Sequence, residues 1–326
     1  MSSEPRGKDK DAQNKKVVCK YCESEKLVKW GRQNGHQRYR CKDCSHLFDD
    51  NNNPPRMRTR LEVIANALEL YYSGASLPTT SRLLWKLFKV KASARTILNW
   101  IQKYVPRIED FTVNLRPQGS GIWHADETSL SIRPQRPLTR VQKQKRFRRK
   151  GELHWFWDAI DEKTRYILGC HLSRERSDEE ATEFFKKCRR NAGKPEKVLT
   201  DGLGAYNHGI SRGLRIRRSQ HIANVGLRGG HNNQLIERFH GTLKDRTDIM
   251  RGLVSAETQI PNGFVIYYNF LRPHTSLNGR TPAQASGIDL PFEDGWGDLV
   301  KWSTTFEARK RWNGNGDGME IELVAT

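Results

Sequence analysis

Residues 197–206 read KVLTDGLGAY and residues 232–244 read NNQLIERFHGTLK. Each segment contains a carboxylate whose neighbours predict the local structure around it. Asp201 follows a short β-branched, apolar run and precedes two glycines, so it is expected where a buried strand ends and a loop begins. Glu237 lies in a helical pattern, because apolar residues recur beside it at i, i+3 and i+7. That predicted buried stripe consists of Ile236, Phe239 and Leu243. The two segments therefore predict a strand-end aspartate and a helical glutamate.

A third carboxylate stands in another strand-like run, GIWHADETSLSI, at residues 121–132. Side chains alternate between the two faces of a strand, and this parity selects Asp126 over Glu127. A shift of one residue in register would exchange them. Asp158 and Asp161 are rivals for the same role. Asp161 falls in a predicted hairpin turn, where aspartate is common, and Asp158 precedes it on the strand with no partner that the sequence identifies.

Three carboxylates brought together from two strands and a helix suit a hard divalent cation. Mg²⁺ prefers oxygen ligands and keeps coordination positions for substrate phosphates. Two such ions about 3.5–4 Å apart stabilise the attacking and leaving oxygens of an in-line phosphoryl displacement. Asp126, Asp201 and Glu237 therefore predict a site for Mg²⁺ or Mn²⁺ that cuts and joins a nucleic-acid backbone.

The segments between these carboxylates predict a mixed sheet. HWFWDAI (154–160) and RYILGCHLS (165–173) have the composition of two strands joined by a turn. A helix is expected after Ser177, which would form a capping box with Glu180. Another strand is expected within 215–221. This order predicts an α/β fold, a mixed sheet with helices on its faces.

The composition points to a polyanionic partner. The chain has 57 Lys and Arg against 37 Asp and Glu, a formal charge of +20 over 326 residues, and nucleic acid is the commonest partner for such a surplus. The sequence has no apolar run of 18 residues and no signal-peptide core at its N-terminus. We therefore expect a soluble, intracellular protein without a membrane partner.

Residues 17–50 have the pattern of a zinc ribbon. Two Cys-x2-Cys pairs separated by 18 residues are a strong signature of a structural zinc site. The expected ligands are Cys19, Cys22, Cys41 and Cys44. Four cysteines already complete a tetrahedron, so His36 and His46 are interpreted as surface residues. Cys170 and Cys188 are isolated and are interpreted as buried free thiols.

Residues 56–106 contain three helical patterns, the first two separated by a glycine-containing turn. The third carries Arg95 among polar residues. A helix-turn-helix DNA-binding domain and an ordinary three-helix bundle both fit this pattern. The basic residues of the ribbon, with Trp30 and Tyr39 between them, could likewise follow a DNA backbone or form a solvated face.

Two further segments are basic or polar. Residues 1–16 lack apolar periodicity and are expected to form a disordered basic tail. Residues 133–151 hold nine basic residues and no acidic one, which favours a loop that contacts DNA phosphates. Its candidate DNA contacts are Lys145, Arg146, Arg148 and Arg149.

These contexts resemble one known family. Asp126 in DET, Asp201 in TDGLGAY and Glu237 in NNQLIERFHGTLK are similar to the acidic triad of insertion-sequence transposases and retroviral-type integrases. That family commonly carries Lys or Arg seven residues after its glutamate, the position of Lys244 here. YYNFLRPHTSLNGRTPAQASG, at residues 267–287, resembles the stretch that closes the core of bacterial and archaeal transposases.

The resemblance spans roughly residues 17–288. It implies a ribonuclease-H-like DDE catalytic core at residues 118–288, preceded by the zinc ribbon and the helix-turn-helix. Residues 289–326 match nothing in the family pattern and are treated as a C-terminal tail of unknown role. The implied activity is transposition: water attacks a phosphodiester at the element end, and the freed 3′-OH then attacks target DNA.

The resemblance also implies roles for particular residues. Asp126 and Asp201 would be shared with both Mg²⁺ ions, and Glu237 would complete one shell. Lys244 would hold a DNA phosphate. His240 would orient the scissile phosphate or a metal-bound water, or would be packed inside the protein.

The implied partner is double-stranded DNA, both element ends and target. Synapsis of two ends implies at least a dimer, acting in the cytoplasm of a prokaryotic host. Two alternatives stay open: a non-catalytic or domesticated DNA-binding regulator, and a nuclease of the same fold. The intact triad with Lys244 favours an enzyme over a regulator.

Overall fold

The structure, a computed structural model, describes residues 17–51, 53–55, 57–132, 152–223, 225, 233–249, 253, 255 and 257–312. They form two compact units. One comprises the described residues up to Arg60 together with the end of the last helix, from Thr304, and the other comprises Leu61–Ser303. The predicted tail at 1–16 and basic loop at 133–151 lie outside the described residues. Within the described part, no helix is long and apolar enough to cross a membrane.

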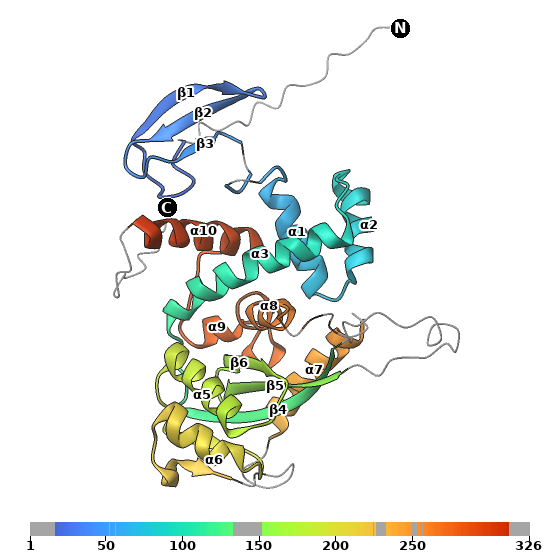
Figure 1. Ribbon diagram of the computed structural model, residues 1–326, viewed down its shortest axis with the longest axis vertical. Coiled ribbons are helices and arrows are strands. Elements are labelled where there is room, and N and C mark those ends of the chain that lie inside the picture. Colours follow the sequence, from blue (N-terminus) through green and yellow to red (C-terminus); the bar gives the residue numbers. More distant parts are fainter. Residues whose placement is uncertain are drawn as a thin grey trace, which may run out of the picture. The chain divides into compact units, whose positions relative to one another are not determined.

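The first unit is built on a three-stranded antiparallel sheet (Figure 1). Its strands are β1 (Leu27–Gln33), β2 (His36–Cys41) and β3 (Leu47–Asp49). Cys19, Cys41 and Phe48 form its buried core, with Tyr39 packed against it. Such a core is too small to hold a fold by burial alone.

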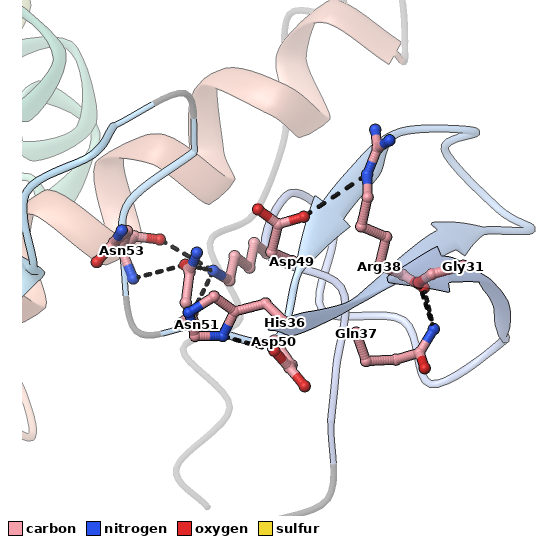
Figure 2. Close-up of polar contacts among 9 residues, drawn as sticks. Gly31, His36, Gln37, Arg38, Asp49, Asp50, Asn51 and Asn53 are labelled. Carbon is pink, nitrogen blue, oxygen red and sulfur yellow. Dashed lines mark hydrogen bonds and ion pairs between the residues drawn. The ribbon is translucent and has the colours of Figure 1, made fainter. Parts of the chain in front are cut away.

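The chain that leaves the ribbon is fastened back onto it. The amine of Lys20 donates hydrogen bonds to Oδ1 of Asn51 at 2.8 Å and to the backbone oxygen of Asn53 at 3.1 Å. Figure 2 shows Asn51 and Asn53 beside the ion pair of Arg38 with Asp49. These contacts join the segment after β3 to the first cysteine pair.

The second unit begins with a three-helix bundle. Its helices are α1 (Leu61–Tyr72), α2 (Leu77–Phe88) and α3 (Ala94–Thr112). Ser76 and Ser93 cap α2 and α3, because each side chain accepts a backbone N–H in the first turn. The Gly74 in the turn between α1 and α2 has φ +136°, which an L side chain rarely adopts.

A five-stranded mixed sheet follows, in the order β6-β5-β4-β7-β8. The strands are β4 (Ile122–Ile132), β5 (Glu152–Asp161), β6 (Ile167–Ser173), β7 (Lys197–Leu199) and β8 (His221–Ile222). The first three are antiparallel, and β7 and β8 run parallel to β4. In chain order the arrangement is 3-2-1-4-5, that of a ribonuclease-H-like core. The strand expected within 215–221 is wrong by most of its length, because β8 begins only at His221.

Helices cover both faces of this sheet (Figure 1). The helices after β6 are α5 (Asp178–Ala192), α6 (Ala205–Gly209), α7 (Gln234–Ile249), α8 (Ile260–Ile266), α9 (Pro282–Ala285) and α10 (Trp296–Trp312). Of these, α10 packs on the three-helix bundle rather than on the sheet. Ser177 caps α5 by accepting the N–H of Glu180, as predicted, but the Glu180 carboxylate contacts His171 and does not complete the predicted capping box. In the segment treated as a tail of unknown role, Trp296 of α10 is buried and stacks on Tyr72 of the bundle at 5.1 Å.

The edge of β6 is closed by a side chain. Asn269 is buried, its Oδ1 accepts the N–H of Ile167 at 2.9 Å, and its Nδ2 donates to the C=O of Ile167 at 2.9 Å. The amide therefore satisfies both backbone groups of an edge residue, as a neighbouring strand would. This gives a physical reason for the asparagine in the YYNFLRPH segment.

Replacing Asn269 with leucine is expected to lower the free energy of unfolding by about 2–4 kcal/mol, because it leaves both polar groups of Ile167 buried and unpaired. Urea denaturation followed by circular dichroism measures the change. Leucine at the exposed Asn99 of α3 is the matched control and should shift stability by less than about 0.5 kcal/mol. Equal effects at the two positions would contradict this role.

Candidate active site

Two parallel strands bring Asp126 and Asp201 together. In the β4–β7 ladder His124 lies opposite Leu199, so each aspartate lies two residues beyond the same pair. Residues two apart on an extended chain share a face. The two carboxylates therefore lie side by side on the same face at the ends of the two strands. Ligand atoms of Asp126, Glu127 and Asp201 lie within 4.8 Å of one another.

Helix α7 supplies the other side of the site. The predicted stripe of Ile236, Phe239 and Leu243 is buried, as expected. It packs α7 against β4 and β5, which turns the adjacent helical face toward Asp126. Ligand atoms of Asp126, Glu237 and His240 lie within 4.8 Å of one another. The structure thus gathers the three predicted carboxylates around one shared residue, Asp126.

His240 has its polar contacts inside the protein. Its ring is 2 % exposed, and Nε2 lies 2.7 Å from Oδ1 of Asp158, which is fully buried. Its Nδ1 lies 4.0 Å from Oδ2 of Asp126. This location favours the packed alternative for His240 over a direct contact with DNA. Burial lowers the pKa of His240, but Asp158, Asp126 and Glu237 together raise it above its ordinary value.

The carboxylates are crowded. Burial is the main cause that raises the pKa of Asp126 to about 7; His240 opposes the shift, and the neighbouring carboxylates add to it. Those neighbours are Asp158, Asp201 and Glu237. Neighbouring carboxylates in a partly desolvated site raise one another's pKa, because ionisation of one disfavours ionisation of the next. A bound cation would lower these pKa values again.

Glu127, the residue after Asp126 on β4, is the centre of a hydrogen-bond network beside the site. Its side chain is 1 % exposed and accepts hydrogen bonds from Arg176 and from the hydroxyl of Tyr206. Arg176 also lies over the ring of Trp155, 4.6 Å from its centroid, and 3.8 Å from Oδ2 of Asp201. Glu127 therefore holds a guanidinium beside Asp201, and sequence parity alone could not reveal this role.

Replacing Glu127 with glutamine is expected to lower the free energy of unfolding by about 1–3 kcal/mol, because the amide keeps only one acceptor oxygen for Arg176 and Tyr206 and loses the charge that pairs with Arg176. Thermal and urea denaturation measure the change. Glu183→Gln is the matched control, since its exposed pair with Lys186 should contribute less than about 1 kcal/mol. An effect at Glu127 no larger than the control would show that the network is not stabilising.

The rival carboxylates are now placed. Asp161 is a turn residue: its Oδ1 accepts the N–H groups of Lys163 and Thr164, and its Oδ2 accepts that of Ser120. Asp158 is instead at the site, because it pairs with Asp126 across the β4–β5 ladder and so points to the same face. The sequence alone does not determine the pairing register of β4 and β5, and this register is what places Asp158 beside Asp126.

The residues predicted to contact DNA differ in their exposure to solvent. Lys244 is exposed on α7 and Arg95 is exposed near the start of α3. Lys145, Arg146, Arg148 and Arg149 lie outside the described residues. His240 is buried, as described above.

The four cysteines of the ribbon converge as a tetrahedral metal requires. Sγ atoms of Cys19 and Cys44 lie 3.5 Å apart, and those of Cys22 and Cys41 lie 3.6 Å apart. Zinc–sulfur bonds of about 2.3 Å in a tetrahedron place sulfurs about 3.8 Å apart, so the cluster could bind zinc. His36 contacts Asp50 and His46 stacks on Tyr21. Cys170 and Cys188 are buried free thiols, as predicted.

The sheet order is that of a ribonuclease-H-like core, and the carboxylates on β4, after β7 and on α7 could hold a metal ion. Residues 146–266 match a family model described as a DDE domain. Asp201 and Glu237 lie inside this range, whereas Asp126 precedes it.

Known transposases are similar to this chain. The transposase for insertion sequence-like element IS431mec of Staphylococcus aureus is 23 % identical over 200 residues, covering 60 % of this chain and 79 % of that one. The transposase of element IS257 in transposon Tn4003, also from Staphylococcus aureus, matches to the same extent. Over these residues the chain is similar to DDE transposases of insertion sequences.

Among solved structures, the HTLV-2 integrase catalytic core in complex with magnesium is 17 % identical, covers 53 % of this chain and 98 % of that one, and has a TM-score of 0.36. The Mos1 strand transfer complex is 10 % identical, covers 84 % and 83 %, and has a TM-score of 0.27.

Proposed function

We propose that this protein is a DNA transposase that binds the ends of its element, cleaves a strand there and joins it to target DNA with two divalent cations. One observation carries the proposal: Asp126 belongs to two ligand groups, one with Glu127 and Asp201 and one with Glu237 and His240. A residue common to two such groups is what a two-cation phosphoryl-transfer site requires.

The donor set fits Mg²⁺ or Mn²⁺, because carboxylate oxygens dominate both groups. When bound, the cations would activate the attacking oxygen and stabilise the leaving one. Asp126 would bridge the two positions, Asp201 would complete one and Glu237 the other. Arg176, held by Glu127 beside Asp201, would keep that carboxylate in place. Lys244, exposed on the same helix as Glu237, would hold a DNA phosphate as a point charge.

The remaining parts would supply DNA binding. The net charge of +20 favours association with the phosphate backbone. The ribbon, with one structural Zn²⁺, and the bundle of α1, α2 and α3, acting as a helix-turn-helix, would recognise element ends. Arg95 lies near the start of α3, the helix that would enter the major groove. Joining two ends calls for at least a dimer. The relatives' description as transposases supports DNA as the partner.

A strand-transfer assay tests the proposal. The purified chain, Mg²⁺ and a labelled duplex of the DNA flanking its own gene are incubated with plasmid. Labelled plasmid is the expected product, and omission of the divalent cation should abolish it. Cleavage without joining would identify a nuclease instead, and binding without cleavage would identify a regulator.

A further inference from the structure

Asp158 and His240 form a buried pair that the roles above leave unused. Asp158 is fully buried on the strand beside β4, and its cross-strand neighbour is Asp126. A carboxylate in such a position is costly unless a partner compensates it. Among the described residues, Oδ2 of Asp158 has no hydrogen-bond partner, and Oδ1 is bonded to Nε2 of His240. Within the described part of the chain, the imidazole is therefore the only group that compensates this acid.

The pairing fixes the direction of the ring. With Nε2 facing Asp158, Nδ1 is the nitrogen that faces the catalytic carboxylates, 4.0 Å from Oδ2 of Asp126. Hydrogen bonding of one ring nitrogen to a carboxylate fixes the tautomer and raises the basicity of the other. Nδ1 is thus the ring nitrogen left for the ligand group that His240 forms with Asp126 and Glu237.

The spacing suits a shared ion. Metal–ligand bonds of about 2.1 Å place two ligands of one octahedral ion about 3 to 4 Å apart. The ligand atoms of Asp126, Glu237 and His240 lie within 4.8 Å of one another before any ion draws them together. The group with Asp201 offers carboxylate oxygens alone, so the two positions differ chemically.

We propose that His240 is a metal ligand through Nδ1, in the position shared by Asp126 and Glu237, and that Asp158 is the positioning residue that orients its ring. This inference rests on the cation site of the proposed function. A mixed nitrogen and oxygen set favours a first-row transition ion over Mg²⁺, and Mn²⁺ is the member of that row that shares the preference of Mg²⁺ for carboxylates. We therefore expect both positions to accept Mg²⁺ and the Glu237 position to bind Mn²⁺ more tightly than Mg²⁺.

Electron spin-echo spectroscopy of bound Mn²⁺ tests the ligand directly. The full chain, loaded with zinc and free of DNA, is given less than one equivalent of Mn²⁺. We expect the ¹⁴N modulation of a directly bound imidazole, its loss in His240→Gln, and its retention in His171→Gln, a histidine paired with Glu180 on the opposite face of the sheet. A wild-type Mn²⁺ spectrum without ¹⁴N modulation would overturn the proposal, and this result does not depend on the folding of any variant.

The role of Asp158 has its own measurement. Asp158→Asn keeps an acceptor for the ring but removes the charge, and loss of such an outer partner typically weakens metal affinity by 10–100-fold. We expect that loss for Mn²⁺ titrated by electron paramagnetic resonance, with the ¹⁴N modulation still present at saturation. Unchanged affinity would remove Asp158 from the mechanism.

The two hypotheses fail separately. Strand transfer by a protein whose Mn²⁺ shows no ¹⁴N modulation would overturn the histidine ligand and leave the transposase standing. A ¹⁴N-coupled Mn²⁺ in a protein that joins no DNA would support the ligand and overturn the proposed function.

Discussion

Asparagine in place of Asp201 is expected to abolish strand transfer, with a loss of more than about 100-fold. Removing an outer partner of a metal ligand already costs 10–100-fold, and Asp201 would be a ligand itself. The variant should fold, because the side chain is 40 % exposed and its Oδ1, which accepts the N–H of Leu203 at 2.9 Å, is retained in asparagine. The measurement is the rate of appearance of labelled plasmid with Mg²⁺.

Asp289→Asn is the matched control, since Asp289 is exposed and does not belong to either ligand group. It should join DNA at the wild-type rate. Glu237→Gln should lose activity as Asp201→Asn does, and both should still bind end-containing duplex, because binding would depend on other parts of the chain. Substantial joining by Asp201→Asn would remove this carboxylate from the catalytic site.

Local sequence was enough to select three carboxylates that the structure brings together. Asp201 was placed by a short apolar run before a glycine-rich loop, and Glu237 by a helical stripe whose members are all buried. Strand parity separated Asp126 from Glu127 in the prediction, and in the structure the two carboxylates lie close together beside Asp201. These signals are local periodicities, which the backbone geometry of strands and helices imposes directly.

Residues that depend on tertiary pairing were not predicted. Asp158 gains its place from its register with Asp126, and Arg176 from a loop that brings it over Trp155. Neither arrangement leaves a periodic signal in the chain. Strand β8, of two residues, is too short to produce alternation, which explains why its position was misjudged. In each case the missing information was long-range geometry rather than residue chemistry.

Chelation of zinc is expected to unfold residues 17–50 while residues 61–303 stay folded. The ribbon has Cys19, Cys41 and Phe48 as its buried core, and two of these three are metal ligands in the expected site. Apparent binding free energies of structural zinc in small modules are about 10–16 kcal/mol at neutral pH, far more than this core can supply. Hydrogen exchange measured by mass spectrometry should show complete loss of protection in β1, β2 and β3, with β4 and β5 unchanged.

Single substitutions separate the metal from the rest of the ribbon. Cys44→Ser should lose zinc, as measured by metal content after dialysis, and should weaken binding to end-containing duplex if the ribbon recognises it. His46→Gln is the matched control: His46 follows Cys44 by two residues, but four thiols already complete the tetrahedron, so zinc content should stay at one per chain. Protection of β1 and β2 that survives removal of zinc would mean that packing alone holds the ribbon. Because the second unit has its own sheet and helical core, the loss of zinc should leave the carboxylate site assembled, and any loss of strand transfer would then be traced to DNA binding rather than to chemistry.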